Sequence, residues 1–222
     1  MSSMSPVIKR IAPILLVAAA CLASADGPTA SKPAAADLLN KAVAQAKQEH
    51  KFVFVEFHAS WCIWCKRLGL VLNDPSVAPF MDANFVTLPI DVFEHDAAHA
   101  ADETPGGVAW MEKLGNASKG QPGGIPFFVV IDDKGNTVLT STLDGTADGN
   151  MGYPSEPKEL DRFFAMLAAP GGTVTDDMKA NIISLLKQDM HIKFDGDKPI
   201  PPTPAGAAPA KPAANPPSPA GS

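Results

Sequence analysis

The chain has 222 residues, 45% of them hydrophobic, and a formal net charge of -6 at pH 7. This length and hydrophobic content are sufficient for one domain with a substantial core and additional extensions. The net charge is negative, and the sequence lacks the excess of basic residues that is typical of a nucleic-acid-binding protein. We therefore expect no nucleic-acid partner.

Residues 1–25 have the pattern of an export signal. Two basic residues precede an apolar run over residues 11–20, and a small-residue A-x-A site follows at residues 23–25. A run of ten apolar residues is too short to span a bilayer. We therefore predict a signal peptide and a periplasmic or secreted mature chain. The alternative is a membrane-anchored lipoprotein in which Cys21 carries the lipid.

The first half of the mature chain predicts a helix–strand–helix order. Residues 26–36 are rich in Ala, Pro and Ser, which is typical of a flexible lead-in. Hydrophobic periodicity and turn residues then predict regular elements. These are a helix over 37–50 capped by Asp37, a strand over 52–57, a helix over 62–72, a short helix over 76–83 interrupted near Pro79, and a strand over 85–90.

The second half begins with a long connection over residues 91–124, whose centre at 107–114 has a helical pattern. Residues 196–222 are nearly all Pro, Ala and Gly, so we expect a disordered tail after a domain that spans residues 37–195. The remaining predicted elements are antiparallel strands over 126–132 and 137–142, a helix over 155–168 capped by Ser155, and a helix over 175–190.

Cys62 and Cys65 are spaced C-x-x-C and are the cysteines left once Cys21 is removed or lipidated. Cys62 would begin a helix, where N–H groups favour a thiolate, and Cys65 would be more buried and would resolve a mixed disulfide. Two other interpretations are open. A zinc half-site would need two more ligands. A purely structural disulfide would close a very short loop and remove little chain entropy.

The strand–W-C-x-x-C–helix stretch at residues 52–68 resembles the active-site segment of the thioredoxin superfamily. Ile125-Pro126 before an apolar strand is similar to the cis-proline loop of that family, and the motif is closest to the W-C-x-W-C of exported members. The resemblance covers about residues 37–168. It implies an α/β thioredoxin fold, with a mixed four- or five-stranded sheet flanked by helices and a long insertion, residues 91–124, before the cis-proline strand.

The resemblance also implies site residues. Cys62 would be the nucleophile and Cys65 the resolving thiol, while Glu56 would be a buried proton acceptor with a raised pKa. No metal and no bound cofactor are implied. The implied substrate-binding residues are Trp61, Ile63, Trp64, Ile125 and Pro126.

We therefore expect a thiol–disulfide oxidoreductase that acts on protein thiols and disulfides and exchanges electrons with a membrane or periplasmic redox partner. Ile63 and Trp64 place no positive charge between the cysteines, which favours a reductase or isomerase over a strong oxidant. One alternative is a thioredoxin-fold binding or docking module of the cell envelope. Another is a metal-handling protein, for which His95 and His99 on one helix face would be candidate ligands.

Overall fold

The structure is a computed structural model of the chain. The predicted signal peptide, Cys21 and the predicted tail from residue 201 onward lie outside the described residues. Within the described part, no helix is long and apolar enough to cross a membrane. The described residues are 32–115, 117–118, 121–196 and 198–200.

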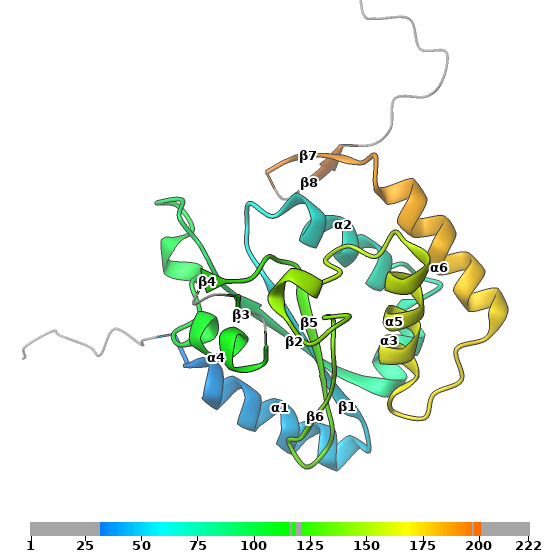
Figure 1. Cartoon of the computed structure of the whole chain (residues 1–222), viewed down its shortest axis with the longest axis horizontal. Helices are drawn as coiled ribbons and strands as arrows, with labels where there is room; N and C mark the ends of the chain where they lie inside the picture. Colours follow the sequence, from blue (N-terminus) through cyan, green and yellow to red (C-terminus); the bar gives the residue numbers. More distant parts are fainter. Residues whose placement is uncertain (1–31, 116, 119–120, 197, 201–222) are drawn as a thin grey trace, which may run out of the picture. The chain divides into compact units, whose positions relative to one another are not determined.

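A mixed sheet forms the centre of the fold (Figure 1). Its order in the described residues is β2-β1-β5-β6, so the predicted mixed sheet is confirmed with four strands. β1 runs parallel to β2 and antiparallel to β5, and β5 runs antiparallel to β6 as predicted. The strands are β1 (Phe52–His58), β2 (Phe85–Asp91), β5 (Phe127–Ile131) and β6 (Thr137–Thr140).

Helices cover both faces of this sheet because its two central strands, β1 and β5, are apolar on both sides. The α-helices of the described residues are α1 (Ala35–Glu49), α2 (Ile63–Leu72), α3 (Ala78–Asn84), α4 (Gly107–Lys113), α5 (Pro157–Ala168) and α6 (Asp176–Asp189). Two single turns of 3-10 helix, η1 (Ala100–Asp102) and η2 (Ala147–Gly149), lie in loops.

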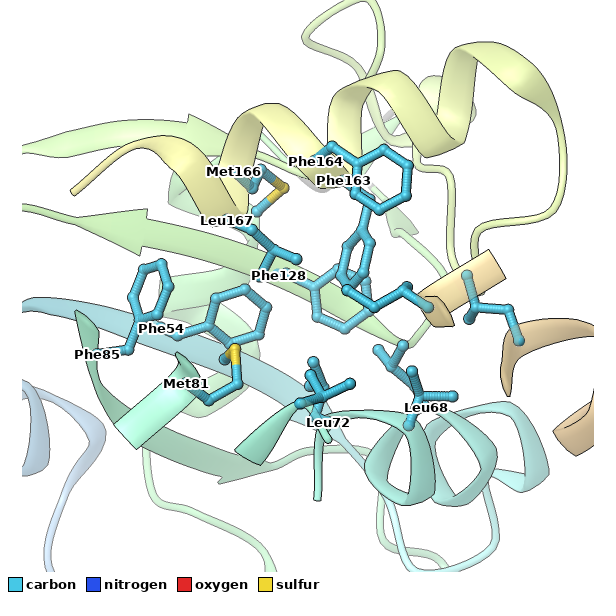
Figure 2. Close-up of a cluster of buried hydrophobic side chains, with 14 of the residues drawn as sticks. Phe54, Leu68, Leu72, Met81, Phe85, Phe128, Phe163, Phe164, Met166 and Leu167 are labelled. Carbon is cyan, nitrogen blue, oxygen red and sulfur yellow. The ribbon is translucent and has the colours of Figure 1, made fainter. Parts of the chain in front are cut away.

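Alternate residues of the central strands supply two buried clusters. Phe54 and Phe128 enter the cluster drawn in Figure 2, where they stack with ring centroids 5.8 Å apart and pack among side chains of α2, α3, α5 and α6. Val55, Phe57 and Val129 enter the opposite cluster, which α1 and α4 cover. The sheet is therefore held from both sides, and its strand ends are positioned rigidly.

Three details of the predicted helices differ from the structure. α1 begins at Ala35, not after a cap at Asp37, because Ala35 is buried and its N–H donates to the Pro105 carbonyl at 2.9 Å. α3 is not interrupted near Pro79, because proline is tolerated in the first turn of a helix. The cap of α5 is Glu156 rather than Ser155, since Pro157 favours the first helical position and a capping box forms there.

The long connection contains η1, the predicted helix as α4, and a short strand pair, β3 (Ala117–Ser118) with β4 (Gln121–Pro122). α4 packs on the sheet: Met111 is fully buried, and the Trp110 ring lies 5.2 Å from that of Phe57. Core packing therefore accounts for these two residues.

The ordered chain extends into the segment predicted as tail. β7 (Lys193–Asp195) pairs antiparallel with β8 (Lys198–Ile200). This pair lies against the start of α2 (Figure 1), where Arg67 donates to the Ile192 carbonyl at 3.0 and 3.2 Å and Lys66 donates to the Gly196 carbonyl at 2.9 Å. The segment after α6 is thus bonded to the helix that carries the cysteines.

Candidate active site

The cysteine pair lies at the start of α2. Cys62 is the N-cap residue, and its Sγ accepts a hydrogen bond from the Cys65 N–H at 3.1 Å. The two sulfurs form a disulfide with an S–S distance of 2.07 Å. Both residues are 4% exposed, so the prediction that Cys65 is more buried than Cys62 is wrong. In the reduced pair, the same N-terminal N–H groups would favour a thiolate on Cys62.

The Ile125–Pro126 peptide bond is cis, which confirms the expectation from the resemblance. Ile125 packs against the small cluster of Ala59, Cys62 and Cys65. The Asn150 side chain donates to the Pro126 carbonyl at 3.1 Å and to the Gly124 carbonyl at 3.0 Å. This loop is therefore a fixed wall next to the disulfide, although its residues are far from the cysteines in sequence.

Two exposed tryptophans flank the buried disulfide. Trp61 is 47% exposed, and its indole N–H donates to the Phe93 carbonyl at 2.8 Å. Trp64 is 41% exposed, with its ring 5.3 Å from that of Tyr153 and 4.5 Å from the Arg67 guanidinium. Exposed aromatic groups of this kind mark interaction surfaces more often than isolated aliphatic residues do.

A groove of about 230 Å³ lies on one side of the pair. It brings together three of the predicted substrate-binding residues, whereas Trp61 and the half-buried Ile63 do not line it. Tyr153 and Met190 were not predicted, since they come from a loop and from the end of α6. The lining residues are Trp64, Ile125, Pro126, Gly152, Tyr153, Ser155 and Met190.

An acid-lined cavity of about 410 Å³ lies next to Cys65. Glu56 from β1 lines this cavity together with Cys65, and its burial raises the pKa of its carboxyl to about 8. A carboxyl with this pKa can bind and release a proton near neutral pH. The cavity is lined by Glu56, His58, Ala59, Ser60, Cys65, Lys66, Gly69, Asp91, Glu94, His99 and Asp102.

His58 adds no positive charge beside the cysteines at neutral pH. Burial lowers the pKa of its imidazole, although the nearby Asp91 and Glu94 carboxylates oppose that shift. Its Nε2 lies 3.3 Å from Asp91 Oδ1 without forming a hydrogen bond. Asp91 instead accepts a hydrogen bond from Lys32 at 2.8 Å.

The histidine pair of the metal-handling alternative does not form. Residues 94–99 are not helical, so His95 and His99 do not share a helix face. His95 Nδ1 lies 3.1 Å from the Phe93 carbonyl, and His99 Nδ1 lies 3.0 Å from Asp102 Oδ2. In the part of the chain that the structure describes, no three His, Cys, Asp or Glu residues are grouped as metal ligands.

Comparisons with known proteins agree with this architecture. Residues 34–132 match a family model described as thioredoxin-like. Together with the sheet order and the cysteine pair, this match confirms the resemblance to the thioredoxin superfamily and the thioredoxin-like fold. The match ends at β5, so the groove residues Tyr153 and Met190 lie outside it.

Three solved structures are similar to this chain. A disulphide isomerase from Xylella fastidiosa Temecula1 has 18% identity over 75% of this chain and 99% of that one, with a TM-score of 0.41. The oxidised C-terminal domain of Neisseria meningitidis DsbD has 27% identity over 49% of this chain and 84% of that one, with a TM-score of 0.33. A DsbH oxidoreductase has 19% identity over 49% and 69%, with a TM-score of 0.31. No curated protein sequence matches the chain.

Proposed function

We propose that this chain is an exported thiol–disulfide oxidoreductase that exchanges disulfides with protein clients through Cys62 and Cys65. The observation that carries the proposal is the disulfide at the N-terminus of α2, next to the cis Ile125–Pro126 loop. A disulfide with a merely structural role would not require exposed aromatic side chains around it. Its position at a helix N-terminus also suits a low-pKa attacking thiol.

In the reducing direction, the Cys62 thiolate attacks one sulfur of a client disulfide. The client S–S bond breaks, a mixed disulfide forms, and the other client sulfur leaves as a thiolate. The Cys65 thiolate then attacks Cys62 Sγ, which releases the second client sulfur and regenerates the disulfide of this structure. A pair of electrons has moved to the client, so a dithiol redox partner must supply another pair. In the isomerase reaction, a second client thiolate would instead attack the client sulfur of the mixed disulfide, form a new client disulfide and release Cys62 as a thiolate, without net electron transfer.

Glu56 is the proposed proton acceptor for Cys65, since both residues line the same cavity. The pKa of Glu56, raised by burial to about 8, approaches that of a free thiol, roughly 8.5. Proton transfer between groups of similar pKa is close to balanced in free energy, so it can proceed in either direction of exchange. Protein clients would lie in the groove beside Trp64 and Pro126 and would also contact Trp61 and Ile63, which lie outside it.

A reductase or isomerase is favoured over a strong oxidant. The residues between the cysteines, Ile63 and Trp64, are uncharged, and burial lowers the pKa of His58. The helix N-terminus is then the main source of thiolate stabilisation, and strong oxidants need more than that. The proposed location is the periplasm or outside the cell, with the redox partner in the membrane or periplasm. Anchoring through a lipid on Cys21 is the alternative form of export.

Substitution of each cysteine tests the exchange. Cys62→Ser should reduce a protein disulfide no faster than the uncatalysed background, because the attacking sulfur is absent. Cys65→Ser should retain the first step and accumulate a covalent client–Cys62 adduct that dithiothreitol releases. The rate of substrate reduction is measured for both variants, and mass spectrometry detects the covalent adduct. A Cys62→Ser protein with wild-type rate would overturn the proposal and favour the docking module.

A further inference from the structure

A loop that follows β2 holds the residues leading into the cysteine pair. The Glu94 carboxylate accepts two hydrogen bonds from Ser60, at 2.5 Å from its N–H and at 2.6 Å from its hydroxyl. The Phe93 carbonyl accepts the Trp61 indole N–H at 2.8 Å. Ser60 and Trp61 directly precede Cys62 in the sequence, so this loop is bonded to the turn that carries the proposed nucleophile.

The loop backbone has an unusual conformation at this point. Phe93 has a φ of 61°, a left-handed conformation that is unfavourable for a bulky residue. The residues on both sides are anchored: the Val92 N–H donates to the His58 carbonyl at 2.8 Å, and the Glu94 N–H donates to Glu103 Oε2 at 2.8 Å. These anchors hold the Phe93 carbonyl toward Trp61 and the Glu94 side chain toward Ser60.

The charge of Glu94 lies in the cavity that Cys65 and Glu56 also line. Among the described residues, the hydrogen bonds to its carboxylate both come from the uncharged Ser60, and it forms no ion pair. Asp91, in contrast, has Lys32 as a cationic partner. The Glu94 charge therefore acts on this cavity without a cation bonded to it.

We propose, building on the exchange function proposed above, that Glu94 is a positioning residue that sets the redox poise of the Cys62–Cys65 pair. Its two bonds hold Ser60, and through it the turn before Cys62. Its negative charge disfavours a nearby thiolate, which exists only in the reduced pair, and leaves the uncharged disulfide unaffected. The pair is thereby more strongly reducing than it would be with a neutral side chain at residue 94.

Glu94→Gln separates charge from position. A glutamine oxygen can accept the Ser60 N–H while its amide donates to the Ser60 hydroxyl, so both contacts persist without the charge. The proposal predicts that the equilibrium with glutathione shifts toward the reduced protein by about threefold to tenfold. That change corresponds to a rise of about 15–30 mV in reduction potential. The thiol pKa of Cys62, followed by thiolate absorbance, should fall in parallel.

Asp96→Asn is the matched control, because it removes one charge from the same loop. Asp96 is exposed, accepts a bond from the Ala98 N–H at 2.9 Å, and does not line the cavity. The reduction potential of the Asp96→Asn protein should equal that of the wild type. Glu94→Ala, which removes both contacts, should also lower the melting temperature and change the fluorescence of Trp61.

Equal potentials in the wild type and Glu94→Gln would overturn the proposal, as would equal shifts in Glu94→Gln and Asp96→Asn. The glutathione equilibrium requires only the two thiols and no protein client. A chain that never reduces a protein disulfide, but whose potential responds to Glu94→Gln alone, would therefore overturn the proposed function while supporting the role of Glu94.

Discussion

The two sides of the Cys62–Cys65 disulfide differ in chemistry. On one side, the acid-lined cavity contains Glu56 and Glu94 and borders Cys65. On the other side, the smaller groove is lined mostly by apolar and aromatic groups, including Trp64 and Met190. Under the proposed function, proton transfer and charge effects would belong to the cavity side, and client side chains would bind on the groove side. Variants on the two sides should therefore change different observables.

Glu56→Gln should have the largest effect among the variants that retain both cysteines. The glutamine amide cannot accept a proton, and general-base catalysis typically contributes about 10²–10⁴-fold. We expect the mixed disulfide with a client to persist about 100-fold longer, with the first attack by Cys62 little changed. Quenched-flow trapping of the adduct measures both steps. A cavity without a role in proton transfer would leave its lifetime unchanged.

The same variant should change the pH dependence of stability. The folded Glu56 has a pKa of about 8, above its ordinary 4.5, so between these values the folded protein binds more protons than the unfolded chain. The wild-type free energy of unfolding should therefore fall as pH rises from about 5 to 8, by at most about 5 kcal/mol. Urea denaturation at several pH values should show this slope in the wild type and in the exposed control Asp82→Asn, but not in Glu56→Gln.

On the groove side, Met190→Asp should alter client selection. A hydrophobic pocket discriminates by roughly 10–200-fold, so we expect kcat/KM to fall about tenfold for a peptide disulfide with an apolar residue beside its cysteine. Exchange with glutathione disulfide should stay within about twofold, because so small a substrate gains little from a side-chain pocket.

Gln188→Asp provides the control, since it adds a charge at the same end of α6 from an exposed position outside the groove. Equal losses for both substrates in Met190→Asp would show that the groove does not select clients. A loss of the same size in Gln188→Asp would assign the effect to the charge near the helix end instead.

Local patterns in the sequence were sufficient for the parts of this molecule that depend on neighbouring residues. The apolar strand at 52–57, the C-x-x-C pair and the Ile125-Pro126 step each carry a short-range signal and together support the family resemblance. The sheet and the cis bond confirm what that resemblance implies for the fold. The sequence alone also identifies Glu56 as a candidate functional residue, because an acid in an apolar strand requires an explanation.

Residues brought together by tertiary folding had no such signal. Glu94 occurs in an acidic loop that resembles any solvated segment, and its bonds to Ser60 span 34 residues. Met190 resembles the end of any amphipathic helix, and only the packing of α6 places it beside Trp64. The cap of α5 was misplaced for a related reason, since Ser155 and Glu156 are both acceptable caps and Pro157 decides between them.

Tyr153→Phe should have the smallest effect and bears on the groove side alone. The buried Tyr153 hydroxyl donates to the Leu186 carbonyl at 2.7 Å, and its loss should cost about 1 kcal/mol, a fall of about 2–4 °C in melting temperature. The ring that contacts Trp64 is retained, so client exchange should stay within about twofold. Burial raises the pKa of Tyr153, so the hydroxyl stays protonated and this cost should not vary between pH 6 and 9. A pH-dependent cost would mean that the groove also responds to protons, and that the two sides are not chemically separate.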